Sequence, residues 1–292
     1  MLSLSAVEIV LFVLAILCYA VAGVASVVQV VGEGRKYRLL LPFLVVLAIF
    51  LEGGVLVLRA VEIKAFPLTG LFESMIALTM VFGVVYLVFS ITIRQIWFSS
   101  IMVWVILAVI LMAGIVAEPA SEPALVAATP WAIAHGAAMV LGAAAVMFAT
   151  ANAVLYLLGS YRLKQKRVMK VLGRMPSIET LGRMNLSGLR VGFVLISVGL
   201  VVGIVLVCLL KTGIVHWLTD WKVMSIVALW LLIAVMLVLN RMSLLRDRTR
   251  AYITILAFGL VLFATVVVAV IGVTRHEFPA EKAGSSPVVQ YE

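Results

Sequence analysis

Eight apolar runs follow one another along this chain, and only short polar segments separate them. Each run reaches about 20 residues, which is enough for one α-helix to cross the hydrocarbon core of a bilayer. The runs cover residues 6–30, 39–59, 69–93, 98–117, 131–158, 186–210, 223–240 and 251–273. We therefore expect an all-α protein, a polytopic membrane helix bundle of about eight transmembrane helices.

The composition supports a membrane protein and excludes a water-soluble globule. Hydrophobic residues make up 65% of the chain and charged residues only 12%, whereas a soluble domain is roughly half apolar and a quarter charged. The longest connection, Gly159–Asn185, is too short for a soluble domain. We predict one membrane domain over residues 1–278, followed by a disordered polar tail over 279–292 that contains Pro, Gly and Ser.

The basic residues alternate between the two ends of the predicted helices. The connections after the first, third, fifth and seventh runs hold 15 Lys and Arg, and the other connections and the tail hold 6. Cytoplasmic loops retain positive charge, so this alternation predicts a multi-pass protein with both termini outside. The net charge of +9 suits a membrane surface, and we expect no nucleic-acid partner.

The three histidines all fall on the predicted outer side. His135 lies about one turn inside the fifth run, His216 in the connection after the sixth, and His276 just beyond the eighth. Neutral imidazole is a common axial ligand of haem iron, and His135 and His276 could hold one iron from opposite sides. The alternative is that each histidine makes an ordinary interfacial contact or a hydrogen bond to a neighbouring helix.

Two tryptophans flank an aspartate in the segment that leads into the seventh run. Trp217 and Trp221 enclose Asp220, and two indoles could form a flat apolar surface for one face of a porphyrin. With His216, these residues are candidates for cofactor binding. The alternative is that the tryptophans anchor helices at the level of the lipid headgroups.

Besides Glu8 near the start of the first run, two carboxylates lie within the predicted spans. Glu73, near the outer start of the third run, should have a partner, because a buried carboxylate is costly when unpaired. Arg59, Lys64, a helix-terminal amide and a bound cofactor are the candidates. Glu52, which the run boundaries place near the outer end of the second span, raises the same question. We otherwise expect almost no charge at central depth, which argues against a coupled-ion transporter.

Several segments resemble a known family, the cytochrome c assembly proteins of the CcsA/ResC type, including their HemX-like members. The resemblance covers nearly the whole chain and is carried by Pro67–Ser74, by Trp131–Gly136 together with Tyr156–Lys166, and by Ile178–Leu181. A fourth segment, His216–Lys222, is similar to the family's tryptophan-rich WWD segment but lacks most of its tryptophans. Val238 stands where the family has a histidine that relays haem inside the membrane.

The resemblance implies a function and a set of partners. His135 and His276 match the two external histidines that hold haem in the family. Haem would be the cofactor, a ResB-type membrane subunit and an apocytochrome c would be partners, and the bacterial inner membrane would be the location. Without the relay histidine and with a degenerate WWD segment, the chain looks more like the HemX-like branch, which is thought to influence the level of glutamyl-tRNA reductase.

Three functional hypotheses remain open at this stage. The chain could present haem at the outer face, or it could regulate a cytosolic haem-pathway enzyme through the basic inner loop Tyr161–Arg183. It could also be a small-molecule permease. We do not expect an enzyme, because no nucleophile with its base and no phosphate-binding loop occurs in a suitable context.

Overall fold

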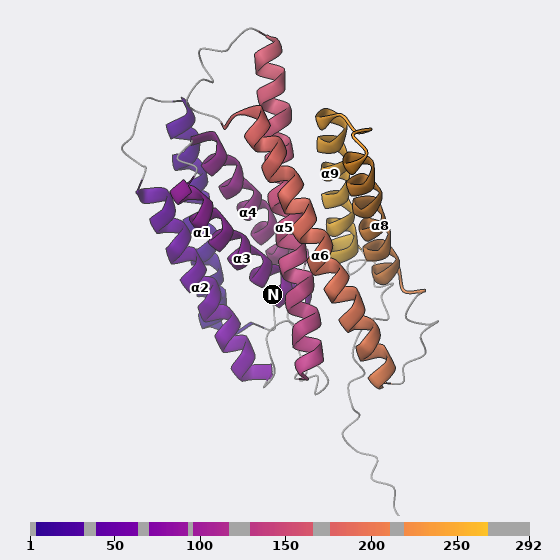
Figure 1. Ribbon diagram of the computed structural model, residues 1–292. Helices are drawn as coiled ribbons and strands as arrows, with labels where there is room; N and C mark the ends of the chain where they lie inside the picture. Colours follow the sequence, from indigo (N-terminus) through magenta and orange to yellow (C-terminus); the bar gives the residue numbers. More distant parts are fainter. Residues whose placement is uncertain are drawn as a thin grey trace, which may run out of the picture.

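The computed structural model describes residues 4–31, 39–63, 70–92, 96–116, 129–165, 176–210 and 219–267. All regular secondary structure in these ranges is helical, and eight of the helices are long and apolar enough to span a membrane. The predicted all-α membrane bundle is therefore confirmed (Figure 1). The elements are α1 (Ala6–Val31), α2 (Leu40–Ile63), α3 (Leu71–Thr92), α4 (Ile96–Val116), α5 (Pro130–Lys164), α6 (Ile178–Leu210), α8 (Trp221–Arg241), α9 (Asp247–Leu262) and the π-helix η4 (Phe263–Val267).

Helices α5 and α6 extend beyond the apolar runs that predicted them. The 35 residues of α5 correspond to about 52 Å of helix, whereas the hydrocarbon core is about 30 Å thick. Hydropathy locates the membrane boundary, but a helix ends only where its backbone hydrogen bonding ends. The prediction of a loop over Tyr161–Arg183 is accordingly wrong at both ends, since α5 continues to Lys164 and α6 begins at Ile178.

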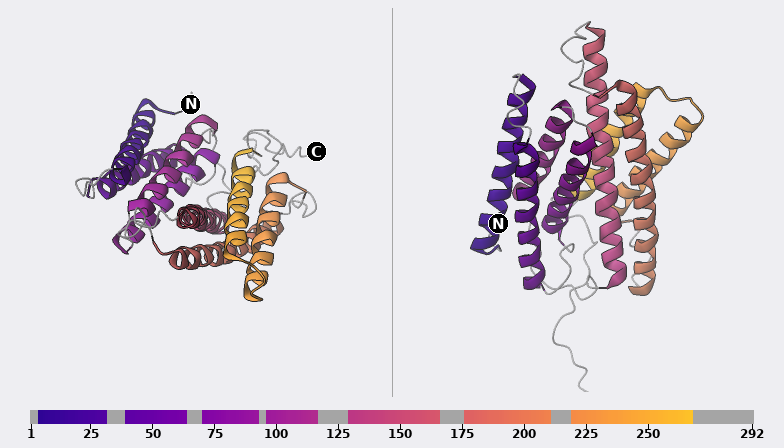
Figure 2. Two further views of the ribbon diagram at one scale, coloured as in Figure 1. Left: turned by 90° about the horizontal axis from the view of Figure 1, so that it is seen from above. Right: turned by 60° about the vertical axis from the view of Figure 1, so that its left-hand side comes forward.

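Helix α5 is the central element of the bundle. It packs against α3 and α4 on one side and against α6 and α9 on the other, and 67% of its spanning segment is buried, against 33–50% for the other spans. Figure 2 shows α1–α4 grouped on one side of α5, with α8 and α9 on the opposite side. Residues near the start of α5 are therefore placed where both halves of the molecule meet.

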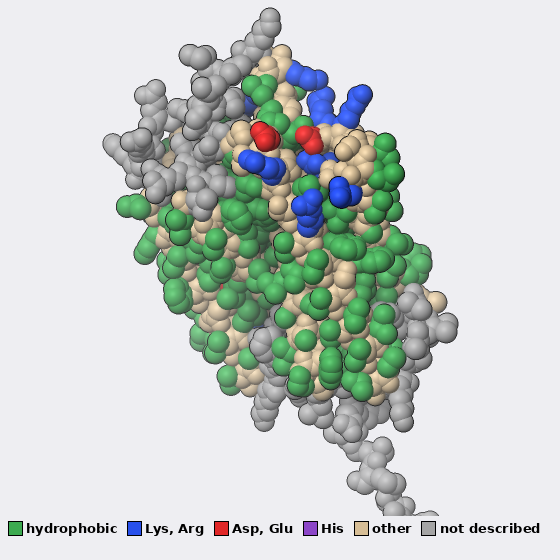
Figure 3. Space-filling model, in the orientation of Figure 1, with side chains coloured by type: hydrophobic (Ala, Val, Ile, Leu, Met, Phe, Trp, Pro, Cys, Tyr) green, Lys and Arg blue, Asp and Glu red, His purple; other side chains and the backbone are tan. Residues whose placement is uncertain are grey.

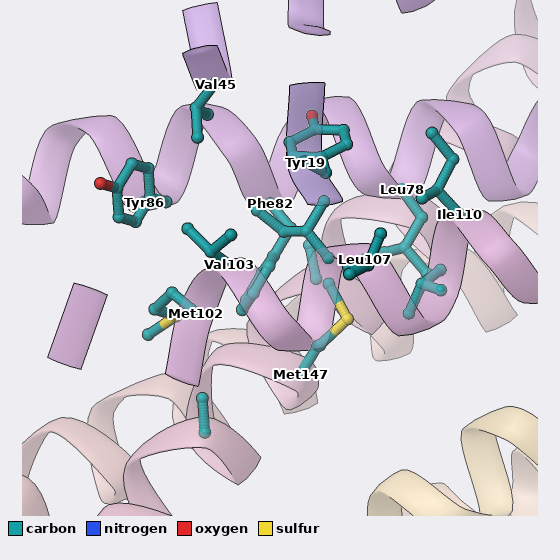
Figure 4. Close-up of a cluster of buried hydrophobic side chains, with 14 of the residues drawn as sticks. Tyr19, Val45, Leu78, Phe82, Tyr86, Met102, Val103, Leu107, Ile110 and Met147 are labelled. Carbon is teal, nitrogen blue, oxygen red and sulfur yellow. The ribbon is translucent and has the colours of Figure 1, made fainter. Parts of the chain in front are cut away.

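The larger apolar core lies mainly among α1, α2, α3, α4 and α5. Tyr19, Phe82, Met102 and Met147 are fully buried there, and Figure 4 shows their side chains converging between the helices. Helices α5 and α6 pack very closely at Gly142, where an added Cβ atom would lie only 2.8 Å from Cγ1 of Ile196.

Charge distinguishes the two ends of the bundle. Most of the described Lys and Arg lie where α5 and α8 end and where α6 and α9 begin, and Figure 3 shows these side chains gathered there. We call this the basic end. Arg250 is buried at this end, where its guanidinium donates to Oδ1 of Asn240 at 2.7 Å and of Asn185 at 3.3 Å. The two bonds connect α9 to α8 and α6.

Candidate functional site

A cavity of about 220 Å³ lies at the opposite end, which we call the cavity end. Helices α3, α4, α5, α6, α8, α9 and η4 contribute to its walls. The lining is mostly apolar, with polar side chains from Ser74, His135, Lys222 and Thr265. Thr265 reaches the wall from η4, and single π-helical turns of this kind are frequent at functional sites. The cavity therefore suits a ligand that is largely apolar and carries a few polar groups.

His135 contributes the one imidazole among the described lining residues. It lies in the second turn of α5, whose start is fixed by Thr129, because the Thr129 hydroxyl accepts from the amide of Ala132. The Nδ1 atom of His135 is 2.8 Å from the carbonyl oxygen of Gly199 in α6. A carbonyl only accepts, so Nδ1 carries the hydrogen, and in the neutral ring Nε2 is left with its lone pair.

Lys222 brings the positive charge to the cavity wall from the first turn of α8. Its position depends on Asp220, whose Oδ1 atom accepts from the Lys222 backbone amide at 2.8 Å and so caps the helix. Asp220 is buried and acts at the helix start, while Lys222 lines the cavity. A cation and an imidazole in one apolar cavity favour an amphipathic ligand that bears carboxylate groups.

The predicted site residues are thus only partly brought together. Trp221 is 54% exposed and is not part of the cavity wall, so its environment is more typical of an interfacial anchor than of a ligand shelf. His216, Trp217 and His276 lie outside the described residues. Joint ligation of iron by His135 and His276 consequently stays a prediction.

Glu73 is paired with a cation. The Nε atom of Arg59 donates to Oε1 of Glu73 at 3.0 Å, and both side chains are almost completely buried. Arg59 was one of the partners expected from the sequence. The same guanidinium lies 2.8 Å from Glu62 and 4.0 Å from Glu8, so it connects α1, α2 and α3. Glu73 is absent from the cavity wall, and these contacts favour a structural role for it.

Glu52 lies deeper than its run suggested. Helix α2 extends from Leu40 to Ile63, which puts Glu52 midway along the helix, where it is fully buried. The expectation that it lies near the outer end of the span is wrong, because the helix continues for a full turn past the apolar run. Sequence analysis also did not identify Lys222 as a site residue, although its position within the segment similar to WWD was a usable signal.

These features define a polytopic membrane protein with an amphipathic cavity at one end of its bundle. The family model of cytochrome c assembly proteins matches residues 68–276, from α3 through α9. The chain belongs to the cytochrome c assembly protein family, which supports a role in the biogenesis of c-type cytochromes. A direct comparison with curated proteins finds no match. Helices α1 and α2 precede the matched region.

Proposed function

We propose that this protein holds haem at its cavity end during c-type cytochrome assembly, with His135 as one axial ligand. The observation that carries the proposal is the 2.8 Å contact between Nδ1 of His135 and the carbonyl of Gly199. Histidines that bind metals commonly donate their second ring nitrogen to such an oxygen, which fixes the tautomer and orients the ring. His135 would bind iron through Nε2.

The other lining residues fit the same group. Apolar side chains such as Met139 and Leu229 suit a porphyrin ring, and the ammonium of Lys222 suits a propionate. The cavity, at about 220 Å³, is smaller than the roughly 300–1,000 Å³ typical of pockets that enclose drug-sized ligands. We therefore expect it to receive the ligated part of the porphyrin and leave the remainder outside it.

The chain's own residues would hold and orient haem, and haem itself would be the group delivered to an apocytochrome. Asp220 fixes the start of α8 and thereby the direction of Lys222. We propose His276 as the second axial ligand, from its match to the second family histidine, and a ResB-type subunit as the membrane partner. By the positive-inside rule, the cavity end would face the outside of a bacterial inner membrane.

The test is an absorption spectrum of detergent-purified protein after expression with added haem. We expect a Soret band that is weakened by His135→Gly and lost when His276→Ala is added. Free imidazole should restore the band of His135→Gly, because it can occupy the space beside Gly199; this rescue separates ligand loss from misfolding. Protein that purifies without haem, or a spectrum unchanged in the double variant, would overturn the proposal.

The role of Lys222 can be measured separately. Lys222→Gln removes the charge and leaves a polar side chain that is one atom shorter, and hydrogen bonds to charged groups contribute about 1.5–3 kcal/mol. We expect haem affinity to fall by about 10- to 100-fold while the position of the Soret band is kept, since axial ligation is not altered. Trp221→Phe is the matched control on the neighbouring residue, and it should bind haem like the wild type.

A second candidate function rests on the basic end. Helices α5 and α6 extend past bilayer thickness there, and Lys164 and Arg183 are exposed on them, Arg183 by 72% of its side chain. We propose, as the alternative, that this surface recruits a cytosolic haem-pathway enzyme such as glutamyl-tRNA reductase. Lys164→Gln with Arg183→Gln should then change the abundance of that enzyme without changing haem content. Unchanged abundance at normal expression of the membrane protein would reject this alternative.

A further inference from the structure

Glu52 takes part in a buried chain of hydrogen-bonding groups that the haem proposal does not use. Its Oε2 atom lies 3.0 Å from the hydroxyl of Tyr19 in α1, and its Oε1 atom lies 2.6 Å from the hydroxyl of Thr79 in α3. The Thr79 hydroxyl is also 2.8 Å from the carbonyl oxygen of Ile76, one turn earlier in α3. All three side chains are fully buried.

These contacts need one hydrogen more than the two hydroxyl groups supply. When each of these three contacts is a hydrogen bond, the Thr79 hydroxyl gives its single hydrogen to Ile76, because a backbone carbonyl can only accept. The tyrosine hydrogen serves the contact with Oε2 of Glu52. The 2.6 Å contact between Glu52 and Thr79 is then a hydrogen bond only if the hydrogen comes from the carboxyl group itself.

The electrostatic surroundings agree with this count. No Lys or Arg forms an ion pair with Glu52 within the ranges that the structure describes. The other charged groups described on the same three helices are Glu8, Arg59, Glu62 and Glu73, and these gather around Arg59 at the cavity end. An ionised carboxylate at the middle of a span without a cation is costly, whereas a neutral acid in this chain satisfies every contact.

We infer that Glu52 is a proton-binding site at the middle of the membrane, occupied in the folded protein. The neutral acid donates from Oε1 to Thr79 and accepts at Oε2 from Tyr19, while Thr79 donates to Ile76. The bound proton thereby completes a hydrogen-bonded chain across α1, α2 and α3. Helices α1 and α2 precede the region matched by the family model, and the site is separate from the haem cavity, whose walls include none of these residues.

Infrared spectroscopy of the full-length protein at neutral pH tests the inference. We expect a carboxylic-acid C=O band that shifts when glutamate carboxyl groups are labelled with ¹³C and that is lost in Glu52→Gln. Glutamine should preserve stability, because its amide oxygen can accept from Tyr19 and its NH₂ group can donate to Thr79. Glu73→Gln is the matched control: Glu73 is paired with Arg59, so the band should remain.

A second variant keeps the test decisive if Glu52→Gln does not fold. Tyr19→Phe removes the donor to the carbonyl oxygen of the acid, so the same band should move to higher frequency. The absence of any ¹³C-sensitive carboxylic-acid band in the wild type would overturn the inference. A band that is identical in wild type and Glu52→Gln, or one removed by Glu73→Gln instead, would overturn it as well. None of these outcomes depends on haem.

Discussion

Replacing Arg59 separates the energy of a buried ion pair from that of an exposed one on the same guanidinium. Arg59→Met leaves the methylene packing largely in place but removes the charge opposite Glu73 and Glu8, whose side chains are 0% and 1% exposed. Removing one member of a buried pair typically costs about 3–5 kcal/mol, because the other charge stays buried and uncompensated. We expect a loss of unfolding free energy in this range.

Glu62 supplies the matched comparison. It lies closer to Arg59 than Glu73 does, at 2.8 Å against 3.0 Å, but 56% of its side chain is exposed. Exposed pairs contribute only about 0.2–1 kcal/mol, so Glu62→Gln should be nearly neutral despite the shorter contact. The double variant Arg59→Met, Glu73→Leu should recover part of the loss, since it replaces the buried pair by apolar side chains.

Reversible unfolding in mixed detergent micelles, followed by tryptophan fluorescence, measures all these variants on one scale. The expected order of destabilisation is Arg59→Met first, then the double variant, then Glu62→Gln. If Glu62→Gln destabilises the protein as much as Arg59→Met does, burial is not what determines the strength of these pairs, and the reasoning fails.

Two further predictions concern helix contacts. Gly142→Val should cost about 1–3 kcal/mol of unfolding free energy by overpacking, because its Cβ would lie 2.8 Å from a side-chain carbon of Ile196. Gly259→Val is the control and should cost less in the same unfolding assay, because nothing lies within 4 Å of its added Cβ. Equal losses would refute the packing argument. Arg250→Leu leaves the buried oxygens of Asn185 and Gly182 without their donor and should cost at least about 1–3 kcal/mol of unfolding free energy. Arg248→Leu, at an exposed position on the same helix, should be nearly neutral. Thermal unfolding that ranks the two variants in reverse would contradict a stabilising role for the hydrogen bonds of Arg250.

The spans and their order could be predicted from the sequence, because crossing a bilayer imposes a length and a hydropathy that few segments satisfy by chance. The alternation of Lys and Arg among the connections is likewise a property of the sequence alone. The sequence predicted that Glu73 has a partner, because a buried carboxylate requires one. The short connection from α2 limited the candidates to a few, of which Arg59 is the one observed.

The sequence alone could not assign the carboxyl group of Glu52 or the imidazole of His135 to their partners. Tyr19 and Thr79 meet Glu52 from helices distant in sequence, and Gly199 lies 64 residues from His135. Helix periodicity shows which face of a helix is apolar but not which helix it meets. In a bilayer the lipid is as apolar as the neighbouring helix, so close packing and hydrogen bonding between helices select the partner, and only the tertiary structure records that choice.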